Sequence, residues 1–284
     1  MFDRIARAAY RRLRPQARNS LRGWLAQEAQ DTAPLPLQRF DERRVLVLAP
    51  HPDDEVIGCG GVIACHVQAG ARVRVLVMTD GRWGDARLHA PALQGAERER
   101  LQAALVQARR EESRAAAALL GVAELHFLER PDGGLCADAA TVGALRQQLQ
   151  EFAPDLVYLP FVWDLHPDHW QTNLVLCAAA AAGLPAAANL PLRGYEVWSP
   201  LPANRLVDIS AQMPLKLQAL AAFVSQLREL DYRRMVEGLN AYRSGALGAG
   251  RGHAEAFHEL PLSAYQRLVR ATQGAAAPTQ RSRP

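Results

Sequence analysis

The sequence predicts an α/β fold with three layers, in which helices cover both faces of a mostly parallel sheet. Three observations support this class. Short apolar runs, typical of buried parallel strands, recur along the chain. Longer segments with helical periodicity separate these runs, as expected for βαβ units with right-handed crossovers. The 284 residues are 49% hydrophobic and 22% charged, an ordinary globular composition with enough chain to bury a core.

The strands and helices are expected to alternate along most of the chain. The apolar run Val45–Ala49 is the first strand, and the helix after it is expected from about Val56 to Gln68, ending at Gly70. The polar stretch 82–95 is expected to be a loop, either a lid over a site or a plain surface loop. Further strands are expected at 73–78, 125–128, 156–159 and 195–198, and further helices at 96–120, 139–152, 171–182, 212–230 and 232–243.

Composition divides the chain into three parts. Residues 1–42 form a basic arm and linker, 43–265 form the α/β domain, and 266–284 form a tail that is expected to be disordered. The net charge is +4, yet residues 1–26 hold seven arginines against one aspartate and therefore carry +6. The rest of the chain is nearly neutral, so its charge does not indicate nucleic-acid binding.

The basic arm has three interpretations. Its apolar residues share one helical face with arginines opposite, and Pro15 ends that helix. Such a helix can lie on an anionic membrane surface, mediate contacts between subunits, or pack on its own domain. We find neither a membrane-spanning segment nor a secretory signal near Met1. No CxxC pair is present, so a reducing cytoplasm is expected, at the inner membrane face if the arm binds lipid.

The first strand ends in a cluster of titratable side chains, within the segment Ala49-Pro50-His51-Pro52-Asp53-Asp54-Glu55. An imidazole and three carboxylates beside a buried strand are costly unless a divalent cation compensates them. His51 and Asp54 can face one point if the backbone turns at Pro52. Asp53 would then lie near the metal without binding it, which is the place for a base that acts on water.

The strand expected at 156–159 is followed by a second cluster, which contains His166, Asp168 and His169. Ligands in parallel sheets bind beyond the carboxyl ends of the strands, so both clusters are expected at one edge. Nitrogen and oxygen ligands without a thiolate suit zinc, and also iron(II), manganese or cobalt. A structural His-Pro turn or a solvated helix cap would explain one cluster, but two at the same edge favour a catalytic metal site.

Two other motifs have structural interpretations. The segment Gly58-Cys59-Gly60-Gly61 lacks the third glycine of a dinucleotide fingerprint, because position 63 is Ile63. Close packing of helix on sheet explains these glycines better, with Cys59 as a buried thiol rather than a ligand. The pair Arg109 and Arg110 is interpreted as a solvated helix end, with sugar recognition as the alternative.

The two clusters together resemble the LmbE-like/PIG-L family of N-deacetylases. The segment 49–55 and the downstream segment 166–169 carry the resemblance, which runs from about residue 43 to 260. It implies a Rossmann-like three-layer α/β fold, while the arm before the first strand departs from the family pattern. Further segments that agree with the family are Gly58–Gly61, Thr79–Gly81, Arg109–Glu112, Leu120–Val122, Pro131–Leu135, Lys216, Ser225–Gln226 and Ala254–Phe257.

The resemblance implies a metal centre with a defined ligand set. His51, Asp54 and His169 match the zinc ligands of the family, and Asp53 matches the general base. Zinc would polarise the acyl carbonyl and lower the pKa of water, and Asp53 would take up the proton. Fe²⁺, Mn²⁺ and Co²⁺ are alternative metals for these ligands.

The resemblance also implies supporting and substrate-binding residues. His166 matches the histidine that stabilises the tetrahedral intermediate and helps the amine leave. Asp168 matches a carboxylate that orients this histidine. Asp132 and one of Arg109 and Arg110 lie in segments that contact sugar hydroxyls in family members.

Three functional hypotheses follow. The first is a zinc-dependent hydrolase that removes an N-acyl group, most simply acetyl, from a small or lipid-linked amino sugar or glycoconjugate. The second is an amidase for another acylated amine, such as a thiol conjugate or a natural-product glycoside. The third is a sugar- or metal-binding protein without catalysis, against which the intact Asp53 and His166 argue because binding alone needs no base.

Overall fold

The computed structural model describes residues 17, 33–182, 189–248 and 250–273. The strands are β1 (Leu35–Pro36), β2 (Arg44–Ala49), β3 (Arg72–Thr79), β4 (Glu124–Arg130), β5 (Leu156–Pro160), β6 (Pro191–Tyr195), β7 (Arg205–Asp208) and β8 (Ala254–Pro261). The α-helices are α3 (Asp54–Gln68), α4 (Gly95–Leu120), α5 (Ala139–Phe152), α6 (Pro167–Ala181), α7 (Met213–Leu220), α8 (Val224–Leu227), α9 (Tyr232–Ser244) and α10 (Leu262–Gln273). Two short 3₁₀ helices are η2 (Ala86–His89) and η4 (Gly245–Leu247).

The strands form one mixed sheet with the order β1-β7-β8-β6-β5-β2-β3-β4. Strands β2 to β6 pair in parallel, whereas β8 runs antiparallel to both β6 and β7. β2 lies between β3 and β5, with Val45 paired to Val73 on one side and to Leu156 on the other. The carboxyl ends of β5, β2, β3 and β4 therefore lie next to one another along one edge of the sheet.

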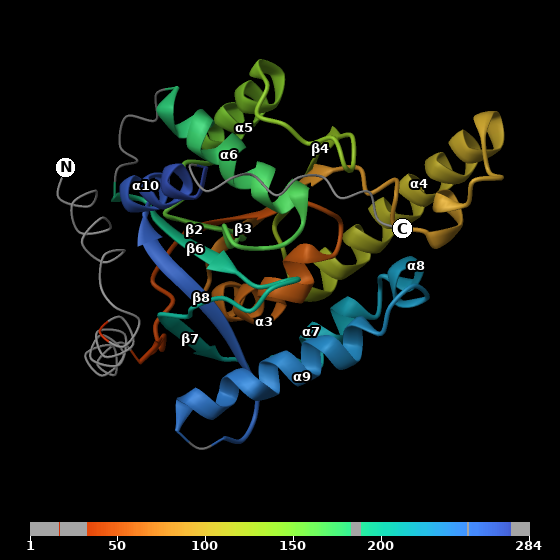
Figure 1. Cartoon of the computed structure of the whole chain (residues 1–284). Helices are drawn as coiled ribbons and strands as arrows, with labels where there is room; N and C mark the ends of the chain where they lie inside the picture. Colours follow the sequence, from red (N-terminus) through yellow and green to blue (C-terminus); the bar gives the residue numbers. More distant parts are fainter. Residues whose placement is uncertain (1–16, 18–32, 183–188, 249, 274–284) are drawn as a thin grey trace. The chain divides into compact units, whose positions relative to one another are not determined.

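Helices cover both faces of the sheet, so the predicted three-layer α/β fold is confirmed (Figure 1). On one face, apolar residues of α3, α4, α7 and α9 pack on the sheet, with Val47, Val75 and Tyr158 at the sheet surface. On the other face, α5, α6 and α10 pack against Leu46, Leu76 and similar residues. Successive residues of β2 thus enter opposite cores, and a continuous apolar run is needed to fill both.

The structure corrects three of the predicted elements and adds two strands that were not predicted. β6 spans 191–195 rather than 195–198. β7 and β8 were not predicted because charged residues interrupt their apolar residues, so neither contains a continuous apolar run of strand length. The helix expected at 212–230 is interrupted where Phe223 turns into the core and is fully buried. Residues 266–273, expected in a disordered tail, instead belong to α10, whose residues Tyr265 and Val269 are buried.

Two findings concern membrane spans and the two ends of the chain. Among the described residues, no helix is long and apolar enough to cross a membrane. The expected arm helix before Pro15 and the tail residues 274–284 lie outside the described part of the chain. The interpretations of the arm therefore remain predictions, as do the domain boundaries at 42 and 43.

Candidate active site

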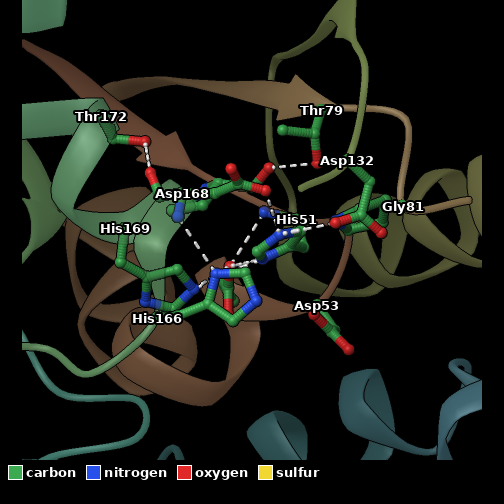
Figure 2. Close-up of polar contacts among 12 residues, drawn as sticks. His51, Asp53, Thr79, Gly81, Asp132, His166, Asp168, His169 and Thr172 are labelled. Carbon is green, nitrogen blue, oxygen red and sulfur yellow. Dashed lines mark hydrogen bonds and ion pairs between the residues drawn. The ribbon is translucent and has the colours of Figure 1, made fainter. Parts of the chain in front are cut away.

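The two predicted clusters meet at the carboxyl edge of the sheet. The turn after β2 supplies His51 and leads into α3 at Asp54, while the loop after β5 leads into α6, whose first turn holds His169. Figure 2 shows the imidazoles of His51, His166 and His169 gathered together, with Asp132 and Asp168 beside them. Because β2 and β5 are parallel neighbours, segments more than a hundred positions apart end side by side.

Three ligand atoms form a compact triangle at the centre of this cluster. His51 Nδ1 lies 3.1 Å from Asp54 Oδ2 and 3.3 Å from His169 Nε2, and the last two atoms are 3.1 Å apart. Metal–ligand bonds of about 2.0–2.2 Å at tetrahedral angles place ligand atoms roughly 3.3–3.6 Å apart. The triangle therefore fits a zinc-sized cation, and all three residues are at most 8% exposed.

Carboxylates also contact His51 and His169 at the ring nitrogens that face away from the triangle, and these contacts orient both rings toward it. His169 Nδ1 lies 3.1 Å from Asp164 Oδ1, and His51 Nε2 lies 3.1 Å from Asp168 Oδ2 and 3.3 Å from Asp132 Oδ1. A carboxylate that accepts one ring N–H leaves the other ring nitrogen with its lone pair for a metal. His51 Nδ1 and His169 Nε2 are therefore the nitrogens prepared for coordination.

The cluster offers other sets of ligand atoms within 4.8 Å of one another. One set joins His166 to His51 and His169, and the other joins His51 to Asp132 and Asp168. The second set uses His51 Nε2, which two carboxylates already contact. We favour the triangle with Asp54 because all three of its sides measure 3.1–3.3 Å and it leaves His51 Nε2 with its hydrogen-bond acceptors.

Asp53 has an unusual backbone at the start of α3. Its φ is 120° and its ψ is −28°, a conformation that non-glycine residues rarely adopt and that costs about 1–3 kcal/mol. The residue is 4% exposed, and its Oδ2 lies 3.1 Å from Arg109 Nη2. Burial raises the pKa of Asp53 to about 7, against the opposing effect of the Arg109 charge. A buried carboxyl of this kind is poised to exchange protons near neutrality.

His166 caps the first turn of α6. Its Nδ1 accepts a hydrogen bond from the backbone N–H of Asp168 at 3.2 Å, so the proton of the neutral ring resides on Nε2. The ring stacks edge to face on His51 with centroids 4.5 Å apart. Burial, together with the charges of the neighbouring His51 and His169, lowers the pKa of His166 to about 4. A neutral ring held in this way offers an Nε2–H donor to the site.

The carboxylate of Asp168 does not orient His166, as the family resemblance had implied. Its carboxylate does not bond to His166, because Oδ2 contacts His51 Nε2 and accepts the Gly133 N–H at 2.8 Å. Its link to His166 runs through its own backbone N–H. The reason is that α6 begins at Pro167, which turns the side chain of Asp168 back toward β2. Asp168 therefore orients a predicted metal ligand rather than the predicted acid.

The three predicted substrate-binding residues fall in different surroundings. Asp132 Oδ2 accepts the Trp83 N–H at 3.0 Å, which ties the 82–95 loop to the site. Arg109 is 3% exposed and not a solvated helix end, because α4 packs this side chain toward β2 and β3. Arg110 pairs with Glu129 at the surface and is not in the cluster.

Two further carboxylates of the site, Asp164 and Glu55, have no role in the prediction from sequence. Asp164 holds His169 and also accepts the Trp198 N–H at 2.9 Å. Glu55 Oε2 accepts the Asp53 N–H at 3.1 Å, and burial raises the pKa of Glu55 to about 8. The available signal for Asp164 was its position two residues before His166, where a loop side chain can reach the next helical turn.

The glycines of α3 have the structural role that was expected. A Cβ at Gly58 would lie 2.3 Å from Tyr195 Cδ2, and one at Gly61 would lie 2.6 Å from Ile209 Cγ2. Cys59 is fully buried among apolar residues and is not in the metal cluster. The glycines let α3 approach β6 and the residue that follows β7 closely, which fixes Asp53 and Asp54 at the helix start.

The fold and the site together define an α/β enzyme with a candidate metal centre at the carboxyl edge of its sheet. A family model described as GlcNAc-PI de-N-acetylase (PIG-L) matches residues 46–180. Diacetylchitobiose deacetylase of Thermococcus kodakarensis is 30% identical over 202 residues, which cover 66% of this chain and 72% of that protein. The probable N-acetyl-alpha-D-glucosaminyl L-malate deacetylase 2 of Bacillus anthracis is 31% identical over 199 residues, which cover 66% of this chain and 82% of that protein.

The chain belongs to the PIG-L family, as its motifs indicated. These relatives are named deacetylases, which are hydrolases, so the prediction of an enzyme is confirmed. The N,N'-diacetylchitobiose deacetylase structure from Pyrococcus horikoshii aligns with a TM-score of 0.66 and 27% identity, over 79% of this chain and 86% of that one. The structure of the 4-carboxy-2-hydroxymuconate hydratase GalB of Pseudomonas putida aligns with a TM-score of 0.62 and 24% identity, over 77% of this chain and 96% of that one. At this identity the likeness shows the fold alone. The fold therefore does not determine the reaction, and the site must.

Proposed function

We propose that this chain is a zinc-dependent N-deacetylase that removes an N-acyl group, most simply acetyl, from an amino sugar or glycoconjugate. The observation that carries the proposal is the triangle of His51 Nδ1, Asp54 Oδ2 and His169 Nε2 next to the buried Asp53. The names of the relatives, which specify diacetylchitobiose and an N-acetylglucosaminyl malate, support the substrate class.

The donor set supports zinc as the metal. Two imidazole nitrogens and one carboxylate oxygen leave a fourth tetrahedral position open, as in catalytic zinc sites. Zinc bound there would polarise the acyl carbonyl and lower the pKa of a water molecule. Fe²⁺, Mn²⁺ and Co²⁺ suit the same donors, so metal reconstitution belongs in the test.

The side chains divide the proton transfers between them. The Asp53 carboxylate accepts a proton from the attacking water. The Nε2–H of His166 donates to the acyl oxygen as negative charge develops on it. The proton taken up by Asp53 then passes to the nitrogen, the C–N bond breaks, and the free amine and acetate leave. Asp164 and Asp168 keep the imidazoles of His169 and His51 in place throughout.

A substrate panel tests this function. Metal-free protein, reloaded with one equivalent of Zn²⁺, Fe²⁺, Mn²⁺ or Co²⁺, is incubated with N-acetyl and longer N-acyl amino sugars bearing varied aglycones. Released primary amine and free acid are quantified together. We expect equimolar amine and acetate from at least one N-acetyl sugar. Release only from acylated thiol conjugates or other non-sugar amides would reject the amino sugar, and no release by a fully metal-loaded protein would reject the enzyme.

Asp53→Asn separates catalysis from metal binding. We expect this variant to keep its metal and to lose about 10²–10⁴-fold in kcat, the contribution typical of a general base. Metal content by plasma emission and amine release are measured on the same sample. A variant with near-wild-type kcat would show that another group takes the proton.

A further inference from the structure

Several segments around the candidate metal centre are linked to one another by hydrogen bonds. The Trp83 N–H donates to Asp132 at 3.0 Å, which joins the 82–95 loop to the turn after β4. Gln226 Nε2 donates to the Gly84 carbonyl at 3.1 Å, which joins the same loop to α8. The chain then passes from α8 within a few residues to α9. The loop and these two helices thus form a connected boundary beside the site.

An aromatic pair continues this boundary from α9 to the loop after β5. The rings of Tyr232, at the start of α9, and Trp198, after β6, have centroids 6.0 Å apart. The Trp198 N–H donates to Asp164 Oδ2 at 2.9 Å. Asp164 Oδ1 in turn lies 3.1 Å from His169 Nδ1. Two contacts therefore connect Trp198 to a proposed metal ligand.

Tyr232 also lies close to the proposed base. Its side chain is half-buried at the start of α9. Burial, together with the negative charges of Asp53 and Asp54, raises the pKa of its hydroxyl. Because electrostatic interactions weaken with distance, this effect places Tyr232 near Asp53. The aromatic pair thus extends from the proposed base to the side of the site behind His169.

Exposed apolar side chains are concentrated on these segments. We define the rim as residues 161–166, 196–200 and 224–235. Nine large apolar side chains are exposed among the described residues, and six of the nine belong to the rim. Single exposed apolar side chains are common on protein surfaces, but a group of them in one place indicates a binding surface. The six are Trp163, Leu165, Trp198, Val224, Leu230 and Met235.

The side of the site behind His51 is polar instead. Asp132 Oδ1 lies 3.3 Å from His51 Nε2, and the Asp132 N–H donates to Asp80 Oδ1 at 3.3 Å. Arg82 Nε donates to the same Asp80 at 2.8 Å. Carboxylates and a guanidinium suit hydroxyl groups, whereas the rim suits a group without polar atoms. The two sides together fit a substrate that has a polar sugar and an apolar part.

We propose that Leu165, Trp198 and Tyr232 form a subsite for an apolar aglycone, an alkyl or aryl group joined to the amino sugar. This inference rests on the proposed function. The acyl carbonyl must reach the triangle of histidine and aspartate ligand atoms, so the rim contacts a part of the substrate remote from the amide. The relatives' names specify diacetylchitobiose and a malate, whose linked groups are polar. An apolar aglycone would therefore set the substrate of this chain apart from theirs.

Alkyl glycosides test the subsite in the wild-type protein. Methyl and octyl glycosides of the N-acetyl sugar that the substrate panel identifies are compared below the concentration at which micelles form. We expect the octyl glycoside to have a KM at least about tenfold lower at similar kcat, because burial of an alkyl chain strengthens binding away from the reacting atoms. Equal KM values for the two glycosides would overturn the proposal.

Two rim variants locate the contact. We expect Trp198→Ala and Leu165→Gln each to reduce the octyl advantage in KM from about tenfold to below about threefold, because each removes apolar contact area. Leu165 is 78% exposed, so its variant covers the case in which Trp198→Ala does not fold. Tyr242→Ala is the matched control, because Tyr242 is an exposed aromatic of α9 outside the rim and should keep the full advantage. A full octyl advantage in both rim variants would reject these residues.

Acyl chain length separates the aglycone from the acyl group as the occupant. N-acetyl and N-octanoyl forms of the methyl glycoside are assayed with wild type and both rim variants. We expect the ratio of kcat/KM for the two acyl groups to stay within about twofold of the wild-type ratio in each variant. A changed acyl ratio with an unchanged octyl advantage would assign the rim to the acyl chain and overturn the proposal.

Binding of products tests the subsite without relying on turnover. Methyl and octyl glycosides of glucosamine, which have no amide to cleave, are titrated into metal-loaded protein by calorimetry. We expect the octyl form to bind wild type at least about tenfold more tightly, and both rim variants to lose most of this difference. If wild type released no amine from any substrate, the proposed function would fail while this result would still support the subsite. Equal affinities in an active enzyme would reject the subsite alone.

Discussion

At the scale of single residues, the carboxylates behind the imidazoles matter as much as the ligands. Asp164 and Asp168 each contact the ring nitrogen that faces away from the triangle. They thereby set which nitrogen of His169 and of His51 carries the lone pair. Sequence reasoning identified the imidazoles but assigned Asp168 to His166 and gave Asp164 no role.

Removal of single ligands should empty the metal centre. We expect His51→Ala and His169→Ala to lose most bound metal, because two donors remain of the three at the triangle. Asp164→Asn should keep all three donors and weaken metal binding about 10–100-fold. Chelator competition measures these affinities, with His258→Ala, outside the cluster, as the control. Full metal occupancy in both alanine variants would rule out the ligand set.

His66 predicts an acid-sensitive stability unrelated to the metal. It is fully buried, accompanied by Tyr158, Arg193 and Glu42, and burial followed by the Arg193 charge lowers its pKa to about 3. Between pH 6.5 and 3 the unfolded chain binds one more proton at this residue. The free energy of unfolding should therefore fall by about 1.4 kcal/mol per pH unit on acidification in this window.

His66→Gln isolates that contribution because it removes the titrating ring. The variant should be less stable than wild type at pH 7, and the difference should narrow as the pH falls below 6.5. Urea unfolding at a series of pH values measures it. A stability difference that stays constant from pH 7 to pH 4.5 would contradict the assignment.

At the scale of elements, α3 is held by a buried charged group as well as by its glycines. Glu255 on β8 accepts the backbone N–H groups of Gly61 and Val62 at 2.8 and 2.7 Å. Lys216 on α7, the sole lysine in the sequence, lies 2.7 Å from Glu255 and is fully buried. This contact joins α3, α7 and the antiparallel strand around one ion pair.

Lys216→Met should leave the Glu255 charge buried without its cation. We expect a loss of about 3–5 kcal/mol in the free energy of unfolding, as for other broken buried pairs. The double variant Lys216→Met with Glu255→Gln should recover part of that loss, because the uncompensated charge is gone. Urea unfolding compares the three proteins. A loss below about 1 kcal/mol in the free energy of unfolding of the single variant would show that the Lys216–Glu255 ion pair contributes little to stability.

At the scale of the whole molecule, the linker before β2 contributes to the domain. Leu37 N–H donates to the Leu206 carbonyl at 2.7 Å, and Phe40 packs on His66 with ring centroids 5.0 Å apart. Glu42 Oε1 accepts from Arg193 Nη2 at 3.0 Å. The residues just before the predicted boundary at 43 therefore make specific contacts.

Truncation tests where the folding domain begins. A chain that starts at residue 33 should have a Tm close to that of the full chain, because it keeps Leu37, Phe40 and Glu42. A chain that starts at residue 43 loses these contacts and should melt several degrees lower. Calorimetry at matched metal content compares them. Equal Tm values for the two truncated chains would show that the folding domain begins at residue 43, as predicted from the sequence.

The sequence by itself determined the α/β class, the first five strands from β2 to β6 apart from the bounds of β6, and the two clusters at their ends. These features are local, because a buried parallel strand needs a continuous apolar run and the chemistry follows directly after it. His51, Asp53, Asp54, His166 and His169 were identified for that reason, with the family resemblance assigning their roles.

Only the tertiary structure decided which carboxylate serves which imidazole, that Arg109 is buried against Asp53, and that α10 continues through residues 266–273. Each of these depends on contacts between segments far apart in sequence. A carboxylate or a guanidinium carries no local signal of its partner, because the gain from pairing arises only when another element removes both groups from water.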